Sequence, residues 1–185
     1  MMLYYIDIQV LPDLETSAAV LMNNLFAKLH RQIATVGNGA VGISFPNVHK
    51  TLGDTLRLHG TQAVLETMMA NTWLKGLRDY THVTTITEIP SDIKGYQTVK
   101  RVQTKSANNK RKRSIAKGWI SADEAIHAIP DTSERKLTLP YVQIQSLSNQ
   151  NVMRVFIEHS QVVSAATDGV FNSYGLSATA TIPVF

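Results

Sequence analysis

One histidine of this chain stands among basic residues, in a position that could support proton transfer. His30 lies between Lys28 and Arg31, near the end of a predicted first helix. A neutral imidazole can remove a proton from a ribose 2′-hydroxyl near neutral pH, because its ordinary pKa is about 6.5. That hydroxyl can then attack the neighbouring phosphate without a metal ion or an external water. Considered alone, His30 is more simply explained as a partly exposed structural histidine.

The other five histidines, His49, His59, His82, His127 and His159, keep that structural interpretation. None has the spacing of a metal-binding motif such as HExxH. The chain contains no cysteine, which excludes a thiolate metal site and a disulfide scaffold. We therefore expect neither a metal ion nor another cofactor.

Three hydroxyl groups are further candidates for chemistry. Ser146 and Ser148 stand at the predicted tip of a hairpin and offer two hydroxyls on one side. Tyr174 supplies an aromatic hydroxyl in a turn over residues 173–177. Nothing in the pattern of the sequence places these groups near His30. Taken in isolation, each is better explained as a turn residue.

Half of the positive charge is concentrated in one segment that has no acidic residue. No Asp or Glu occurs from residue 93 to 122, and nine of the eighteen lysines and arginines lie there: Lys94, Lys100, Arg101, Lys105, Lys110, Arg111, Lys112, Arg113 and Lys117. These charges repel one another, whereas a polyanion would neutralise them and release its own counterions. The segment favours nucleic-acid binding over an ordinary solvated surface.

The start of this basic segment predicts a strand that could read bases. On a strand, Arg101 and Gln103 project to the same side. Arginine can bond two atoms of a guanine edge, and glutamine can do the same for adenine. The pair is weak by itself, because Arg-x-Gln is a common tripeptide.

The middle of the segment, residues 109–117, predicts a short helix. Lys110, Arg113 and Lys117 fall on one face, which suits contact with phosphates, and Arg111 and Lys112 flank that face. We expect Ile115 to point elsewhere and to hold the helix to the rest of the protein.

Length and composition fit a water-soluble protein of one large domain or two small ones. The chain has 185 residues, 44% of them hydrophobic, and a net charge of +4, so the basic segment reflects local patterning. The N-terminus lacks the basic start and cleavage site of a signal peptide. No apolar stretch approaches the ~20 residues that span a bilayer. We expect a cytoplasmic protein that does not bind a membrane.

The first ninety residues predict the order strand, helix, strand, strand, helix, strand. Apolar residues alternate in the four strands, at 3–10, 41–45, 52–59 and 83–89. The helices should begin at the N-caps Asp13 and Thr61. This βαββαβ order is typical of a ferredoxin-like fold.

The second half predicts a different α+β arrangement. A strand over 96–104 leads into the basic helix, and Ser121 with Glu124 forms the capping box of a further helix that ends before Pro130. Strands at 141–146 and 153–159 form a hairpin. The change of composition near residue 93 predicts a ferredoxin-like domain over 1–92 and a second domain over 93–185.

Six short motifs, in this order and spacing, make the whole chain similar to a known family. They are LFAKLH (25–30), GISFP (42–46), RVQTKS (101–106), IPDT (129–132), LPYV (139–142) and YGLS (174–177). With them the chain resembles the type I-F CRISPR-associated endoribonucleases, which mature precursor CRISPR RNA. The resemblance implies a ferredoxin-like N-terminal domain carrying the catalytic histidine and a C-terminal RNA-binding domain with a basic helix.

The resemblance also implies an activity. Enzymes of this family bind the stem-loop of a CRISPR repeat, cut once at the 3′ base of the stem without a metal, leave a 2′,3′-cyclic phosphate and retain the product. It implies that His30 is the general base, that Ser146 holds the attacking hydroxyl with Ser148 as a lesser neighbour, and that Tyr174 orients His30. The implied partners are precursor and mature guide RNA and the other subunits of a type I-F surveillance complex.

Further positions match the family's RNA contacts. The resemblance implies that Arg101 and Gln103 read base pairs at the foot of the stem, and that the helix around residues 110–117 enters its major groove. The RNA-binding set is Arg101, Gln103, Lys105, Lys110, Arg111, Lys112, Arg113, Lys117 and Met153. Lysines stand where arginines are usual, which replaces forked guanidinium groups with point charges. Met153 stands where an aromatic residue stacks under the last base pair.

Two other functions compete with the endoribonuclease. A non-catalytic subunit that only holds an RNA hairpin would use the same scaffold. A sequence-specific DNA-binding protein would account for the charge alone. The joint presence of His30, Ser146 and Tyr174 favours the enzyme.

Overall fold

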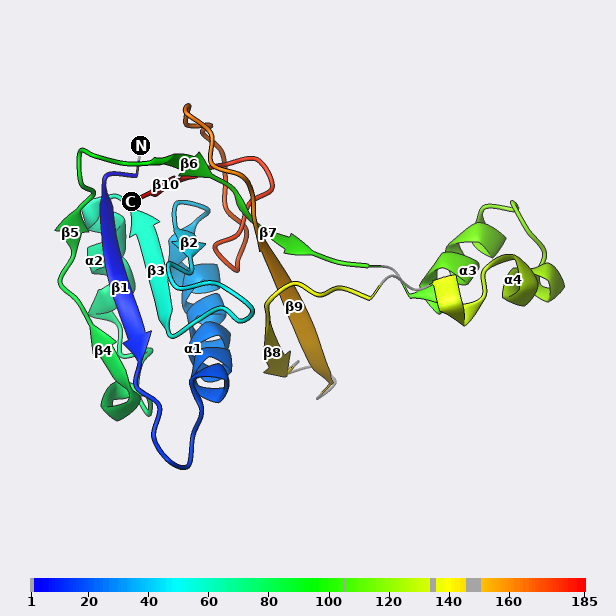
Figure 1. Ribbon diagram of the computed structural model, residues 1–185, viewed down its shortest axis with the longest axis horizontal. Coiled ribbons are helices and arrows are strands. Elements are labelled where there is room, and N and C mark those ends of the chain that lie inside the picture. Colours follow the sequence, from blue (N-terminus) through cyan, green and yellow to red (C-terminus); the bar gives the residue numbers. More distant parts are fainter. Residues whose placement is uncertain (1, 105, 134–135, 146–150) are drawn as a thin grey trace. The chain divides into compact units, whose positions relative to one another are not determined.

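The protein is an α+β protein, as predicted from the order of its elements. The computed structural model describes residues 2–104, 106–133, 136–145 and 151–185. The chain forms two compact units, Met1–Arg101 with Leu139–Phe185, and Val102–Thr138 (Figure 1). These limits differ from those of the proposed domains, 1–92 and 93–185. The proposed division into domains stays a prediction.

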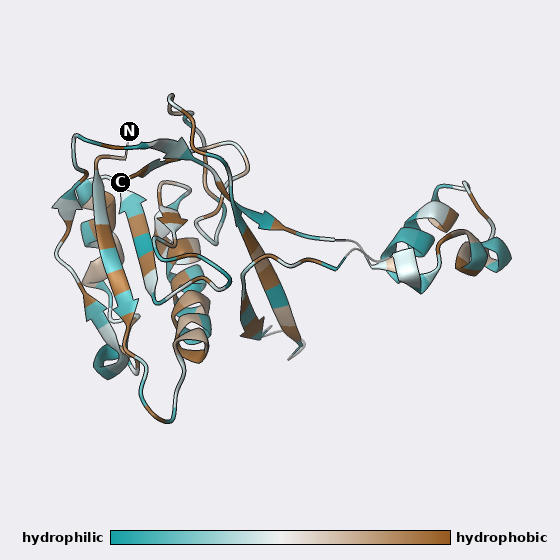
Figure 2. Cartoon of the chain, in the orientation of Figure 1, coloured by the Kyte–Doolittle hydropathy of each residue, from teal (hydrophilic) through white to brown (hydrophobic). Residues whose placement is uncertain are grey.

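The first unit is built on a sheet with the strand order β2-β3-β1-β4, in which β5 also pairs with β1. All these pairs are antiparallel. The strands are β1 (Tyr4–Val10), β2 (Gly42–Ser44), β3 (Thr55–Gly60), β4 (Thr81–Val83) and β5 (Thr87–Glu88). Apolar and polar residues alternate along β1 and β3 because successive side chains point to opposite faces, seen as brown and teal bands in Figure 2.

The predicted strand at 83–89 is interrupted in the structure. Residues 84–86 separate β4 from β5, and the side-chain Oγ1 of Thr84 accepts the backbone N–H of Asp7 at 3.0 Å. The N–H of Thr84 donates to the carbonyl of Asp7 in return, also at 3.0 Å. A hydroxyl thus takes the place of a ladder carbonyl, which breaks the regular pairing.

Two helices lie behind this sheet in Figure 1, namely α1 (Ala18–Gln32) and α2 (Gln62–Ala70). Thr61 caps α2 as predicted. The prediction that Asp13 caps α1 was wrong, because Ser17 is the N-cap and accepts from the N–H of Val20. Asp13 instead closes a turn before the helix by accepting from the N–H groups of Glu15 and Thr16. A π-helical turn, Ile33–Gly37, follows α1 directly.

The predicted hairpin is present as β8 (Tyr141–Gln145) and β9 (Val152–His159), which are antiparallel. A further strand, β7 (Val99–Val102), lies on the other side of β9. The predicted strand at 96–104 is divided at Thr98, since β6 (Gly95–Gln97) pairs instead with β10 (Ile182–Val184). The chain changes partners there, and Thr98 bonds to Ser160 through both backbone groups.

The core of the first unit joins residues from both ends of the chain. Its fully buried side chains include Ile8, Leu25, Leu58, Val155 and Ile157. A 3₁₀ turn, η2 (Arg78–Tyr80), precedes β4. None of the described helices is long and apolar enough to cross a membrane.

The second unit contains α3 (Ala107–Ala116), α4 (Ala122–Ala128) and the 3₁₀ turn η3 (Asp131–Ser133). Ser106 caps α3 by accepting from the N–H of Asn109. The predicted capping box of α4, Ser121 with Glu124, is confirmed. The Ser121 backbone and hydroxyl donate to the Glu124 carboxylate, and these hydrogen bonds hold its pKa below the ordinary value.

Candidate active site

Helix α1 positions His30 by burying the residues around it. Leu25, Phe26 and Leu29 are buried in the core, and His30 follows in the last turn of the helix with its side chain partly exposed. Phe26 precedes His30 by four residues and therefore shares its face of the helix. The burial of α1 thus fixes the backbone from which the imidazole projects.

The ring of Tyr174 packs on the imidazole. The two ring centroids are 4.0 Å apart with an angle of 9° between the planes. Tyr174 also stacks on Phe26, with centroids 5.8 Å apart, so it is supported by the core. This arrangement restricts rotation of the His30 ring.

A backbone carbonyl determines which nitrogen of His30 carries the proton. Nδ1 of His30 lies 2.8 Å from the carbonyl oxygen of Ser173. A carbonyl can only accept a hydrogen bond, so Nδ1 is the donor and holds the proton of the neutral ring. The lone pair is then on Nε2. A neutral His30 is therefore in the tautomer that a general base requires.

The loop over residues 172–176 carries both groups that contact His30. The side-chain Oδ1 of Asn172 accepts from the N–H groups of Tyr174 and Leu176, at 2.8 and 3.2 Å. Gly175 has φ +73°, and a Cβ on it would lie 2.6 Å from the Ile43 side chain. The carbonyl of Gly175 also accepts from the N–H of Ile43. The loop is thus fixed by its own side chain and by close packing on β2.

Two more of the predicted residues lie beside this stack. The guanidinium carbon of Arg101, on β7, is 5.5 Å from the centre of the Tyr174 ring. Its Nη2 is 4.0 Å from the sulfur of Met153, on β9. Segments far apart in the sequence therefore bring His30, Tyr174, Arg101 and Met153 together. Ser146, Ser148 and Lys105 lie outside the described residues.

The basic helix α3 in the second unit uses part of its charge for its own packing. Arg111 donates to the carbonyl of Ile129 at 2.9 Å and to the carboxylate of Asp131 at 2.7 Å. Nζ of Lys110 donates to the carbonyl of Ser133 at 3.0 Å. Arg111 thus joins α3 to the segment that follows α4.

The remaining cations of α3 are directed to solvent. Lys112, Arg113 and Lys117 are exposed, and Lys117 is the C-cap rather than a residue of the helix proper. The prediction that Ile115 anchors the helix was wrong, since 39% of its surface is exposed. Ala107 is the buried residue of α3, and Arg111 attaches the helix to other residues of the second unit. Gln103 is exposed in the same unit.

Comparisons with known proteins identify relatives over almost the whole chain. Residues 5–185 match the family model described as CRISPR-associated protein (Cas_Csy4). A protein of Escherichia coli (strain UTI89 / UPEC), named CRISPR-associated endonuclease Cas6/Csy4, is 45% identical over 184 residues, which cover 98% of this chain and 99% of the relative. A protein of the same name from Pseudomonas aeruginosa (strain UCBPP-PA14) is 37% identical over 186 residues, with 98% and 99% coverage.

The chain belongs to the Csy4 family. The predicted membership is confirmed. In this Csy4-family chain, the group that sequence reasoning missed is the Ser173 carbonyl, together with Asn172, which fixes its loop. A backbone carbonyl leaves no mark in a sequence. The spacing of Asn172 and Gly175 was the available sign of a rigid turn.

Two other histidines of the Csy4-family chain are removed from solvent to different extents, since His59 is fully buried and His159 is half-buried. Burial, with a smaller effect of nearby Arg57, lowers the pKa of His59 to about 3, and its Nε2 lies 2.8 Å from the hydroxyl of Ser44. Burial also lowers the pKa of His159 to about 4. Nε2 of His159 accepts from the N–H of Phe45 at 3.4 Å. The structural interpretation of these two histidines stays a prediction, and His59 is fully buried where a partly exposed histidine was expected.

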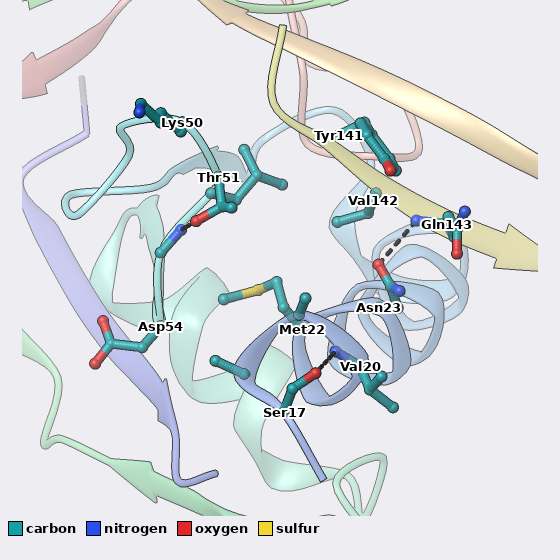
Figure 3. Close-up of a pocket in the computed structure, with 14 residues that line it drawn as sticks. Ser17, Val20, Met22, Asn23, Lys50, Thr51, Asp54, Tyr141, Val142 and Gln143 are labelled. Carbon is teal, nitrogen blue, oxygen red and sulfur yellow. Dashed lines mark hydrogen bonds between the residues drawn. The ribbon is translucent and has the colours of Figure 1, made fainter.

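A pocket of about 630 Å³ lies between the start of α1, the loop over residues 50–54, and β8 (Figure 3). Among the described residues that line it are neither His30 nor Tyr174. Across it, the side-chain oxygen of Asn23 accepts the N–H of Gln143 at 2.8 Å, which joins α1 to the hairpin (Figure 3). This bond holds the strand that leads to Ser146.

Proposed function

We propose that this protein is a metal-independent endoribonuclease that cuts precursor CRISPR RNA at the 3′ base of the repeat stem-loop. The observation that carries the proposal is the His30 ring, which is stacked on Tyr174 and donates from Nδ1 to the Ser173 carbonyl, so that Nε2 is the basic nitrogen. The names of the relatives, CRISPR-associated endonucleases, support the class of reaction.

In the proposed reaction, Nε2 of His30 takes the proton of a ribose 2′-hydroxyl. The 2′-oxygen then bonds to the adjacent phosphorus, and the bond from phosphorus to the 5′-oxygen breaks. The 5′-oxygen leaves and takes up a proton from water, His30 returns its proton to the solvent, and a 2′,3′-cyclic phosphate remains. This chemistry requires only one base and a fixed geometry.

Ser146 is proposed to hold the attacking hydroxyl, with Ser148 as a lesser neighbour. Support comes from the hairpin, in which Ile144 pairs with Met153. The Met153 sulfur contacts Arg101, which lies over Tyr174. The strand that leads to Ser146 thus belongs to the hairpin that contacts the His30 stack.

Recognition of the stem is proposed to use the basic residues of both units. Arg101 and Gln103 would read base pairs at the foot of the stem, and Lys105, Lys112, Arg113 and Lys117 would contact its phosphates. Lys110 and Arg111, which were also expected to bind RNA, would instead hold the helix in place. Met153 would pack under the last base pair. The exposure of Lys112, Arg113 and Lys117 supports this role.

The first unit is proposed to have a ferredoxin-like fold. The element order β1-α1-β2-β3-α2-β4, the strand order β2-β3-β1-β4 and the antiparallel pairing support it. We further propose that the protein works in the cytoplasm, retains its product and caps the stem of the guide RNA among the other subunits of a type I-F surveillance complex.

The test is cleavage of the protein's own repeat RNA in EDTA, with the cut mapped. We expect one cut at the 3′ base of the stem, and no cut when the nucleotide before it lacks the 2′-hydroxyl. His30→Ala should abolish the cut, whereas His82→Ala, at an exposed histidine on β4, should not. If the RNA is bound tightly but recovered intact, the non-catalytic hairpin-binding subunit is the correct alternative.

A further inference from the structure

An exposed tryptophan stands at the end of the basic helix. Trp119 follows α3 by three residues, and 66% of its surface is exposed. Nζ of Lys117 lies 4.4 Å from the centre of its ring. Large aromatic side chains are seldom left so open, because burying them is strongly favourable.

The backbone holds this tryptophan in place without burying it. The N–H of Trp119 donates to the carbonyl of Ser114 at 3.0 Å, and the N–H of Gly118 donates to that of Ile115 at 2.9 Å. Gly118 has φ +68°. These are the two hydrogen bonds of a Schellman motif. In that motif the residue at the position of Trp119 usually packs on the residue at the position of Ser114, but serine offers little apolar surface.

The surroundings of Trp119 fit RNA. It lies in the segment from 93 to 122 that has no acidic residue, and α3 carries exposed cations along its length. Aromatic rings beside cationic side chains bind single-stranded nucleic acids by stacking on bases, while the cations contact the backbone. Bases inside a stem are already stacked and paired, so an unpaired base is the one that offers a free face.

We infer that Trp119 stacks on an unpaired base in the loop of the RNA hairpin. This inference rests on the proposed function. It assigns the loop because α3 follows Arg101 and Gln103, the proposed readers of the foot of the stem, and its ten residues span about 15 Å. Trp119 is at the far end of α3 from those readers along the chain.

The alternative partner for the exposed surface around Trp119 is another protein. Ile126 on α4 is also 66% exposed, and with Ile115 and Trp119 it could form an apolar docking surface. The lysine over the indole ring favours RNA. Ile126 therefore provides the matched control, because base stacking by Trp119 does not require it.

The experiment measures the affinity of the full chain for two RNAs, the protein's own repeat hairpin and the same stem with abasic loop nucleotides. We expect Trp119→Ala to weaken binding of the natural hairpin about 10-fold. Trp119→Phe should retain most of the affinity, and Ile126→Ala should bind normally. On the abasic hairpin, Trp119→Ala and the unsubstituted protein should bind alike.

Two results would overturn the inference. An equal loss on both RNAs would mean that Trp119 supports the second unit and not a base, and unchanged affinity for the natural hairpin would mean that it contacts no base. A loss in Ile126→Ala as large as in Trp119→Ala would assign the surface to general apolar docking. If the unsubstituted protein neither binds nor cuts the hairpin, the proposed function fails as well. If it does both while Trp119→Ala is unaffected, only the inference fails.

Discussion

At the scale of single residues, the proposed chemistry depends on a fixed ring and a fixed tautomer. The Ser173 carbonyl assigns the proton to Nδ1 of His30, and the stack on Tyr174 limits rotation. Neither contact requires the tyrosine hydroxyl. We therefore predict that Tyr174 is a positioning residue that acts through the face of its ring.

Two substitutions of Tyr174 should distinguish the contribution of its ring from that of its hydroxyl. Tyr174→Phe keeps the stack, so we expect its cleavage rate to stay within about 3-fold of normal, whereas Tyr174→Ala should lose about 100-fold because the imidazole is no longer held. Single-turnover rates at saturating protein measure this, with hairpin affinity measured alongside. A phenylalanine variant as slow as the alanine variant would contradict a purely positioning role.

Acid should destabilise the protein through His59 and His159, because the folded chain lowers the pKa of both histidines. Between about pH 6.5 and 4 the unfolded chain holds a proton on His159 that the folded chain lacks, so the free energy of unfolding falls as the pH falls. The slope is at most about 1.4 kcal/mol per pH unit for this histidine. His159→Gln keeps an acceptor for the N–H of Phe45 and should flatten the slope.

Urea unfolding at pH 4.5, 5.5 and 7 measures this dependence. The matched control is His49→Gln at an exposed position, which should keep the slope of the unsubstituted protein. His59 acts in the same direction, so some dependence should remain in His159→Gln. Equal slopes in all three proteins would show that His159 is protonated in the folded state.

At the scale of elements, the loop over residues 172–176 determines the geometry of the site. Gly175 adopts a left-handed conformation and packs against Ile43, and Asn172 bridges two N–H groups of the loop. The positions of the Ser173 carbonyl and of the Tyr174 ring follow from this turn.

Gly175→Ala should therefore slow cleavage and lower stability together. A Cβ would meet the Ile43 side chain at 2.6 Å in a backbone conformation that alanine disfavours. We expect a loss of about 1–3 kcal/mol in the free energy of unfolding and a slower single-turnover rate. Gly76→Ala is the matched control, because Gly76 also has a positive φ but nothing within 4 Å of its Cβ position. Normal cleavage by Gly175→Ala would show that cleavage does not depend on the geometry of this turn.

The sequence predicted elements best where local chemistry decides them. The Thr61 cap, the capping box of Ser121 and Glu124 and the hairpin were all predicted from nearby residues. Predictions were wrong where two local candidates competed, as Asp13 and Ser17 did for one helix end, or where a side chain entered the sheet, as at Thr84. The contact between His30 and Tyr174 could be expected only from the family resemblance, because a contact between residues 144 positions apart leaves no local pattern in the sequence.

At the scale of the whole molecule, the distribution of charge should control how RNA affinity responds to salt. Lys112 and Arg113 are exposed on α3, whereas Arg111 is bound within the second unit. The cations of α3 therefore divide into two exposed ones, Lys112 and Arg113, and two that hold the helix in place, Lys110 and Arg111.

Removing a free cation should weaken binding mainly at low salt. For Lys112→Ala or Arg113→Ala we expect the slope of log affinity against log salt to fall by about 0.7–0.9, the change for one lost phosphate contact. Arg111→Ala should instead lower the melting temperature, since it breaks the contacts to Ile129 and Asp131. Hairpin titrations from 50 to 300 mM salt distinguish the two classes. An unchanged slope in both exposed variants would remove α3 from the interface.

The second unit is inserted into the sequence of the first unit. The chain leaves the first unit after Arg101, in β7, and returns at Leu139, just before β8, and these two strands flank β9. Strands on either side of a third are about 10 Å apart, a gap that a few glycines can bridge. Residues 102–138 could thus be excised, or exchanged for the matching segment of a relative. Such an exchange should change which RNA is bound, while the candidate site of His30 and Tyr174 in the first unit stays the same.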